Sequence, residues 1–174
     1  PRRSARRASG RSRRTRLAYM PDIDFAFLAD AAEAQPGHKF AVIGGGVSRL
    51  GGPVFPLRHP HLALVVGLAV TVPELDAEHE VRFVLLRPDG RELTSGAARI
   101  RASGPGDGGD AVLTFSVDLW NLVFETPGDY SVRLLVDGQE RKRLPLRVET
   151  HEASGGPTTG PGPVPPFPPP TGLA

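Results

Sequence analysis

The stretch PGDYSVRLLVDGQERKRLPLRV, residues 127–148, decides the fold class. Apolar side chains recur at every second position on both sides of Asp137-Gly138, a dipeptide that favours the two-residue turn of a β-hairpin. A period of two is typical of a strand with one buried face, whereas a helix repeats every 3.6 residues. We therefore predict an antiparallel hairpin whose inward positions are Tyr130, Val132, Leu134 and Val136, followed by Leu144, Leu146 and Val148.

Two residues of this hairpin carry more specific predictions. Pro145 has no amide hydrogen to donate to a neighbouring strand, so its strand is predicted to lie at a sheet edge or at a bulge. Tyr130 follows a Pro-Gly turn as it enters its strand. This pattern resembles the tyrosine corner of Greek-key sandwiches, in which the hydroxyl bonds to nearby backbone.

The period of two extends outward from the hairpin over residues 20–149. Turns are predicted at 35–38 and 88–90 and a loop at 104–109, because proline and glycine gather there. Seven to eight short strands separated in this way predict an all-β protein, an antiparallel β-sandwich with two sheets packed face to face. The other apolar faces are predicted at Ile23, Phe25, Phe27 and Ala29, between Lys39 and Gly46, between His61 and Val72, at Val81, Phe83 and Leu85, and at Leu113, Phe115 and Val117.

One short helical turn is predicted, over residues 118–124. Asp118 is suited to cap it, and Leu119, Leu122 and Val123 have the i, i+3, i+4 spacing of a helical face. We expect this turn to cross between the sheets and seal one end of the core. Trp120 would then have a structural role, with ligand stacking as the alternative.

The two ends of the chain differ from the middle in composition. The chain has 174 residues, and eight of its 21 Lys and Arg residues lie in residues 1–19, which contain no acid. We interpret residues 1–19 as a disordered Arg-rich leader, and the single methionine, Met20, suggests that the native protein starts there. Residues 20–150 form the predicted sandwich domain, and the Pro- and Gly-rich residues 151–174 are predicted to be a disordered tail.

Composition also limits the cellular compartments and the kinds of partner that we expect for this protein. The chain has no cysteine, which excludes disulfides, cysteine-ligated zinc and a cysteine nucleophile. The longest apolar run, residues 62–70, is far shorter than the roughly 20 residues of a membrane-spanning helix. We expect a cytoplasmic protein with no membrane contact.

Nucleic-acid binding is expected only if the Arg-rich leader is native. The second basic run, Arg141-Lys142-Arg143, is preceded by an acid and lies in a segment predicted to be a strand at a sheet edge. Charges in such strands commonly prevent unwanted strand pairing. We favour that role over contact with nucleic acid.

The search for chemistry yields one weak candidate. His59 and His61 are two residues apart, as chelation from one strand face requires, but Pro60 is expected to place them in a turn and no third ligand has a fixed spacing. Ser48 lies in a sequence that misses the G-x-S-x-G elbow. The sequence therefore predicts no catalytic residue, no cofactor and no enzymatic activity.

The strand between His61 and Val72 suggests a binding function instead. One of its faces is small and apolar, and that face is either covered by another segment or exposed as a patch. An exposed apolar patch would indicate a surface for another protein or a second copy of the chain, formed by Ala63, Val65 and Ala69. The alternative is small-ligand or carbohydrate binding, or weak hydrolysis, at loops that include residues 59–61 and 104–110.

Three segments resemble a family of bacterial proteins of unknown function. They are FAFLADAAE at residues 25–33, the three glycines at 44–46, and DLWNLVF at 118–124 leading to PGDY at 127–130. The resemblance covers roughly residues 20–149 and implies a small, all-β, immunoglobulin-like protein that begins near Met20. The family has no established activity, so no site residue is carried over from it.

Overall fold

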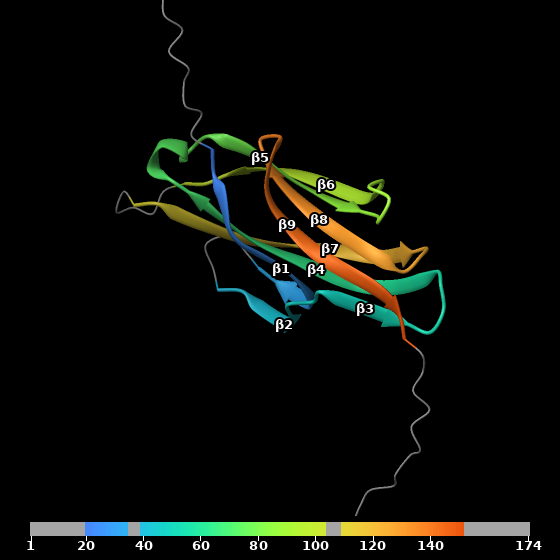
Figure 1. Cartoon of the computed structure of the whole chain (residues 1–174). Helices are drawn as coiled ribbons and strands as arrows, with labels where there is room; N and C mark the ends of the chain where they lie inside the picture. Colours follow the sequence, from blue (N-terminus) through green and yellow to red (C-terminus); the bar gives the residue numbers. More distant parts are fainter. Residues whose placement is uncertain (1–19, 35–38, 104–108, 152–174) are drawn as a thin grey trace, which may run out of the picture.

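The computed structural model describes residues 20–34, 39–103 and 109–151. These residues form nine strands and one short 3-10 turn (Figure 1). The elements are β1 (Asp22–Glu33), β2 (Ala41–Gly45), β3 (Arg49–Gly52), β4 (Leu57–Val70), η1 (Val72–Glu74), β5 (Glu78–Leu86), β6 (Glu92–Arg101), β7 (Ala111–Phe124), β8 (Gly128–Val136) and β9 (Gln139–Thr150).

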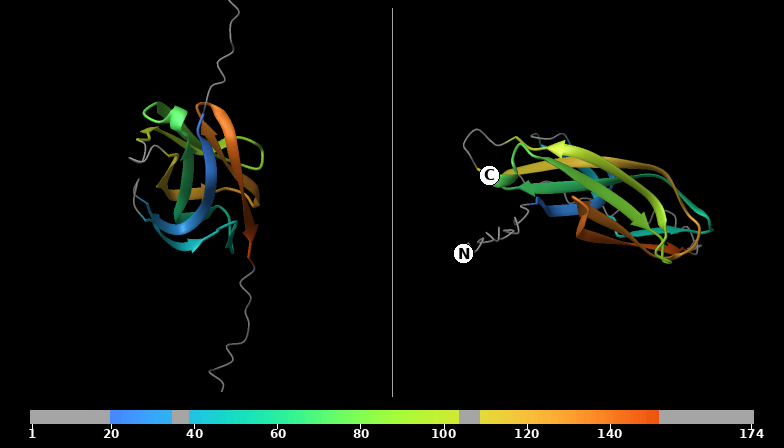
Figure 2. Two further views of the ribbon diagram at one scale, coloured as in Figure 1. Left: turned by 90° about the vertical axis from the view of Figure 1, so that its left-hand side faces the viewer. Right: turned by 90° about the horizontal axis from the view of Figure 1, so that it is seen from above.

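The strands form two sheets, so the predicted all-β architecture of two layers is confirmed. One sheet has the order β2-β1-β4-β7 and the other β3-β9-β8-β5-β6. The views in Figure 2 show the two layers from other directions. Eight of the strands correspond to predicted ones, including β6, which follows the predicted turn at 88–90. The ninth, β3, is a four-residue strand that pairs in parallel with the end of β9.

A single apolar core lies between the two sheets. Strand β4 contributes most of one side, because every second residue from Leu62 to Val70 is buried. Strands β5 and β8 supply the facing side from the second sheet. The core residues on these three strands are Leu62, Leu64, Val66, Leu68, Val70, Val81, Phe83, Leu85, Tyr130, Val132, Leu134 and Val136.

Strand β1 departs from the predicted alternation. Its register with β4 shifts between Ile23 and Phe25, as at a β-bulge, so the residues after the shift face the opposite way. Ile23 and Leu28 are therefore in the core, while Phe25 and Phe27 face outward and stack on each other. The predicted inward set was wrong beyond Ile23, because a bulge changes which face a residue occupies without changing the sequence period.

The predicted helical turn over 118–124 was also wrong. These residues continue β7, which pairs with β4 as far as Phe124. Asn121 has a positive φ of 54°, a conformation that asparagine tolerates better than most residues. Because the backbone turns over there, Leu119 and Leu122 are both buried on the core side, three residues apart. That spacing imitated a helical face.

The hairpin of β8 and β9 matches its prediction closely. Asp137 and Gly138 have positive φ angles of 47° and 80°, as the two central residues of a type I′ turn require. Pro145 pairs with Ser131, and β3 begins to pair with β9 only at Arg147, so β9 is an edge at Pro145. The Tyr130 hydroxyl donates to the Thr126 carbonyl at 2.8 Å, which confirms the predicted backbone bond.

Several predictions fall outside the described residues. They are the leader at 1–19, the turn at 35–38, most of the loop at 104–109 and nearly all of the tail at 151–174. In the described part of the chain, no helix is long and apolar enough to cross a membrane.

Candidate functional site

Two strands, β6 and β7, are the last members of their sheets. Within the described residues, β6 pairs only with β5 and β7 only with β4, so each has one free edge. Between them lies an open apolar cavity of about 330 Å³, which reaches into the space between the sheets. We call this cavity the β6–β7 groove. Its floor is formed by core residues that include Leu64, Val66 and Leu134.

The β6 wall of the groove is made of small residues. Gly96 and Ala98 pair with Phe83 and Val81, whose side chains face the core, so both positions face inward as well. A Cβ atom at Gly96 would lie 2.6 Å from Cε1 of Phe83, so only glycine fits there without a shift of the ring. Ala98 is exposed although it faces inward, because no side chain covers it across the groove.

The β7 wall carries larger residues. Phe115 and Val117 face the core as predicted, but both are only half-buried because the groove beside them is open. Ser116 is the one lining residue with a polar side chain. Its hydroxyl donates to the Ala32 carbonyl at 3.5 Å, on the outer face of the sheet. The interior of the groove is therefore apolar.

The face of β6 that points away from the groove carries two arginines. Arg99 and Arg101 are exposed and pair with Glu80 and Glu78, on the face opposite to Ala98. Arg99 also contacts the Glu78 carboxylate at 3.3 Å. A strand placed beside β6 would meet both arginines directly.

The apolar face that the sequence suggested as an interaction surface is covered within the chain. Ala63 and Val65 have no exposed surface, and Ala69 is half-buried. The covering segment is the end of β1, which pairs with β4 as far as Ala29 and then curves across it (Figure 2). Ser116 Oγ lies 3.5 Å from the carbonyl oxygen of Ala32, so this segment reaches the outer face of β7. Ala63 and Val65 therefore cannot contact a partner directly.

The histidines of the candidate metal pair lie in β4, not in a turn before it. His61 Nδ1 lies 2.8 Å from the Asp30 carbonyl oxygen, and Nε2 lies 2.8 Å from Asp118 Oδ1. Both partners are acceptors, so both bonds form together only when both ring nitrogens carry hydrogen. The ring also packs against Trp120, with centroids 4.0 Å apart. Both nitrogens of His61 are thus committed to holding β1 and β7 against β4.

His59 has a different environment. Its Nε2 is buried without a hydrogen-bond partner. Burial lowers the pKa of His59, and this effect outweighs the opposing influence of the Asp30 charge. Among the described residues, no three His, Asp or Glu side chains are grouped closely enough to hold a metal ion.

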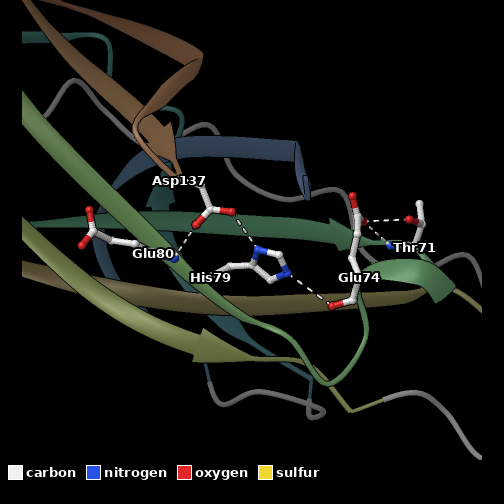
Figure 3. Close-up of polar contacts among 5 residues, drawn as sticks. All are labelled: Thr71, Glu74, His79, Glu80 and Asp137. Atoms are coloured by element: carbon white, nitrogen blue, oxygen red, sulfur yellow. Dashed lines mark hydrogen bonds and ion pairs between the residues drawn. The ribbon is translucent and has the colours of Figure 1, made fainter. Parts of the chain in front are cut away.

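A second histidine–aspartate pair was not predicted. His79, at the start of β5, is buried, and its Nδ1 lies 2.8 Å from Asp137 Oδ2 in the β8–β9 turn (Figure 3). Its Nε2 lies 3.3 Å from the Glu74 carbonyl oxygen. Asp137 also accepts from the Glu80 amide, and the Glu74 carboxylate accepts from the amide and hydroxyl of Thr71. These bonds join η1, β5 and the hairpin turn at one end of the sandwich.

Neither histidine pair has the contacts of a hydrolytic site. In the part of the chain that the structure describes, neither His61 nor His79 hydrogen bonds to a serine or threonine hydroxyl. The loop-end site suggested by the sequence is not assembled either. His61 pairs with Trp120, whereas Asp110 bonds to the Val72 amide, at the far end of the β4–β7 ladder. Residues 104–108 of that suggestion lie outside the described residues.

The β6–β7 groove was not predicted from the sequence. The run Gly96-Ala97-Ala98 was a usable signal, because small residues in a strand leave space unless a neighbour fills it. The partner of His79 was hidden for another reason. Asp137 was assigned only to a turn, and its carboxylate reaches a residue 58 positions away in the sequence.

Comparison with known proteins places the chain in a family. Residues 24–149 match the model of a family described as "Family of unknown function (DUF6941)". The chain belongs to the DUF6941 family. This confirms the resemblance inferred from the three segments of sequence. No curated protein matches the chain by sequence.

Two solved structures share part of the arrangement of strands. One is the Pseudomonas fluorescens alkylpurine DNA glycosylase AlkC bound to DNA containing an abasic site analog, with 11% identity and a TM-score of 0.42. The match covers 74% of this DUF6941 chain and 30% of the glycosylase. The other is the CARDB domain of the Pyrococcus furiosus PF1109 protein in complex with di-metal ions, with 14% identity, a TM-score of 0.33, and 76% and 97% of the two chains covered. Likeness at this level does not extend to function.

Proposed function

We propose that this protein is a noncatalytic interaction module that holds an extended segment of a partner protein along the free edge of β6. The observation that carries the proposal is the apolar β6–β7 groove beside that edge. Exposed apolar surface of this kind marks binding sites more often than it occurs without a role. Among the described residues, neither His61 nor His79 hydrogen bonds to a serine or threonine hydroxyl that could act as a nucleophile, which supports a noncatalytic role.

The free edge favours a partner in the strand conformation. An edge strand has backbone amides and carbonyls without partners, and an extended peptide satisfies them by adding a strand to the sheet. Strand β6 offers ten residues for this pairing. Side chains on alternate residues of the added strand would then point into the groove.

The side chains around β6 specify which segment fits. Cross-strand neighbours pack against each other, so the small and exposed Ala98 leaves room for a large apolar residue on the added strand, whereas the space above Gly96 is already filled by the Phe83 ring. On the other face, Arg99 and Arg101 favour acidic neighbours. The preferred segment therefore alternates large apolar residues with glutamate or aspartate.

A synthetic peptide tests this specification. The probe is a ten-residue peptide that alternates leucine or isoleucine with glutamate, labelled for fluorescence anisotropy and titrated with the full chain. A second peptide has lysine at every glutamate position. We expect the acidic peptide to bind at least about tenfold more tightly, since opposite and like cross-strand charges differ by about 1 kcal/mol for each pair.

Two exposed alanines of β6 provide a matched pair of variants. Ala98→Glu places a charge in the groove, whereas Ala97→Glu places the same charge on the opposite face, beside Arg82. We expect Ala98→Glu to abolish binding of the acidic peptide, and Ala97→Glu to weaken it only severalfold, because the charge at position 97 remains in solvent beside Arg82. Equal effects of the two variants, or equal binding of the two peptides, would contradict the proposal. A dimer that dissociates with Ala98→Glu, in a chain that binds neither peptide, would instead assign the groove to a second copy.

A small apolar ligand is the second candidate for the same groove. The volume of about 330 Å³ is within the range of small-molecule sites. The test is anilinonaphthalene sulfonate, whose fluorescence rises in apolar sites. Binding of this dye that is lost with Ala98→Glu, without binding of either peptide, would favour the small ligand.

A further inference from the structure

We propose that Trp120 and Asp118 form a site for a guanidinium group, separate from the β6–β7 groove. Both residues lie on β7 and face outward, because they pair with His61 and Ala63 on the outer face of β4. Trp120 is the only tryptophan of the chain, and it is 64% exposed. Neither the peptide site on β6 nor any core contact accounts for this exposed ring.

Trp120 is held in place although it is exposed. One face of the indole packs against the His61 ring, with centroids 4.0 Å apart and the planes tilted by 35°. The hydrogen bonds of His61 to Asp30 and Asp118 fix that ring in turn. The other face of the indole is therefore a preorganised flat surface that meets solvent. An aromatic face of this kind attracts cations through its quadrupole, and tryptophan does so most strongly.

The carboxylate of Asp118 supplies the charge that a cation needs. His61 engages only Oδ1, and no hydrogen bond to Oδ2 is present among the described residues. Half of this side chain is exposed. In the described residues, His61 is the only basic side chain paired with Asp118.

A guanidinium fits this arrangement better than other common groups. It is planar, so it stacks on the free face of the indole, and its N–H groups can donate to Oδ2 of Asp118 at the same time. An ammonium has no plane to stack, and a neutral sugar can stack and donate hydroxyl hydrogens to Asp118 but gains no charge attraction from it. The site is therefore suited to an arginine side chain of a partner.

The single tryptophan makes the site directly observable. Its indole N–H gives one signal in a proton–nitrogen NMR spectrum. We would titrate the full chain with N-acetyl-arginine methylamide, after replacing the eight arginines of residues 1–19 by glutamine to remove competing guanidinium groups. We expect a saturable shift of this signal, with a dissociation constant of about 1–10 mM for so small a probe. The citrulline analogue has the same shape without the charge and should bind at least about tenfold more weakly.

Variants separate binding from a structural role. Asp118→Asn should weaken binding of the arginine probe about fivefold or more, through loss of the charge. Trp120→Leu should abolish it, read from the backbone amide of Asn121, with little change in Tm because the side chain is exposed. Val112→Ala is the matched control, since Val112 is another exposed apolar residue on the outer face of β7 and should leave binding unchanged.

Three results would overturn the proposal. The first is equal binding of the arginine and citrulline probes. The second is binding that survives Trp120→Leu, or that falls equally with Val112→Ala. The third is a saturable shift with methyl glucopyranoside and none with the arginine probe, which would make Trp120 a sugar-stacking residue instead.

Discussion

His79 Nδ1 and Asp137 Oδ2 lie 2.8 Å apart although 58 positions separate the two residues in the sequence. The pair joins the beginning of β5 to the turn between β8 and β9, and β5 and β8 are neighbours in one sheet. His79 is buried, so it depends on Asp137 and the Glu74 carbonyl for its hydrogen bonds. This connection closes one end of the sandwich.

Two substitutions of Asp137 are expected to destabilise the fold by different amounts. Asp137→Asn keeps an acceptor for the Glu80 amide and tolerates the positive φ, so we expect a loss of about 1 kcal/mol. Asp137→Ala leaves His79 and the Glu80 amide without this partner and strains the backbone, so we expect about 2–3 kcal/mol. Urea unfolding at pH 7 measures both. Equal losses of unfolding free energy in Asp137→Asn and Asp137→Ala would mean that the acceptor retained in asparagine and the positive φ contribute little to stability.

The same carboxylate predicts how stability depends on pH. Burial raises the pKa of Asp137. Hydrogen bonds from His79 and the Glu80 amide lower this pKa, as do the nearby positive charges of His79 and Arg141. The lowering effects together exceed the effect of burial, so the pKa of Asp137 is below its usual value. A lowered pKa in the folded state stabilises the protein above the unfolded value of about 3.9, and this contribution is lost as pH falls through the folded value.

The difference in unfolding free energy between the wild type and Asp137→Asn should therefore be constant above about pH 5 and shrink below about pH 4. Urea unfolding of both proteins at several pH values between 3 and 7 measures it. A difference that grows on acidification would contradict the direction of the pKa shift.

Asn121 provides a test of the backbone conformation that distinguishes β7 from the predicted helical turn. Its φ of 54° is easy for glycine and costs other L-residues roughly 1 kcal/mol or more. Asn121 is exposed, so side-chain burial contributes little to the comparison. We expect Asn121→Gly to leave the free energy of unfolding within about 0.5 kcal/mol of the wild type and Asn121→Ala to lower it by about 1 kcal/mol. Equal stability of the two variants would argue against the positive φ.

This residue also illustrates what the sequence could and could not predict. Alternation identified the strands because burial of one sheet face imposes a period of two, as in Tyr130 to Val136. It failed at Asn121 and near Asp24, where a local change of backbone conformation reverses the faces and leaves the apolar residues at misleading spacings. Turn chemistry was more reliable, since Asp137-Gly138 and the Tyr130 hydroxyl depend only on nearby residues.

The candidate site could not be predicted in the same way. The β6–β7 groove exists because β6 and β7 are the outermost strands of different sheets, and this lateral order is decided by pairing between distant segments. The small residue at position 98 indicates available space only after its strand has been placed at an edge. The cover over Ala63 and Val65 is equally nonlocal, because it depends on where the end of β1 passes.

Position 67 is expected to require glycine because a side chain there would collide with its neighbour, and not because of its backbone conformation. Its backbone is outside the left-handed region, but a Cβ atom there would lie 2.6 Å from Cδ1 of Phe25, which packs on the outer face of β4. Gly67→Ala must displace this ring, which also stacks with Phe40, so we expect a loss of about 1–3 kcal/mol in unfolding free energy.

Phe25→Ala removes the obstacle and should itself destabilise, through lost apolar contact. The double variant should then be at least about 1 kcal/mol more stable than the sum of the two single losses implies, because the clash is present in only one of the single variants. Additive losses in urea unfolding would show that Phe25 does not lie over Gly67.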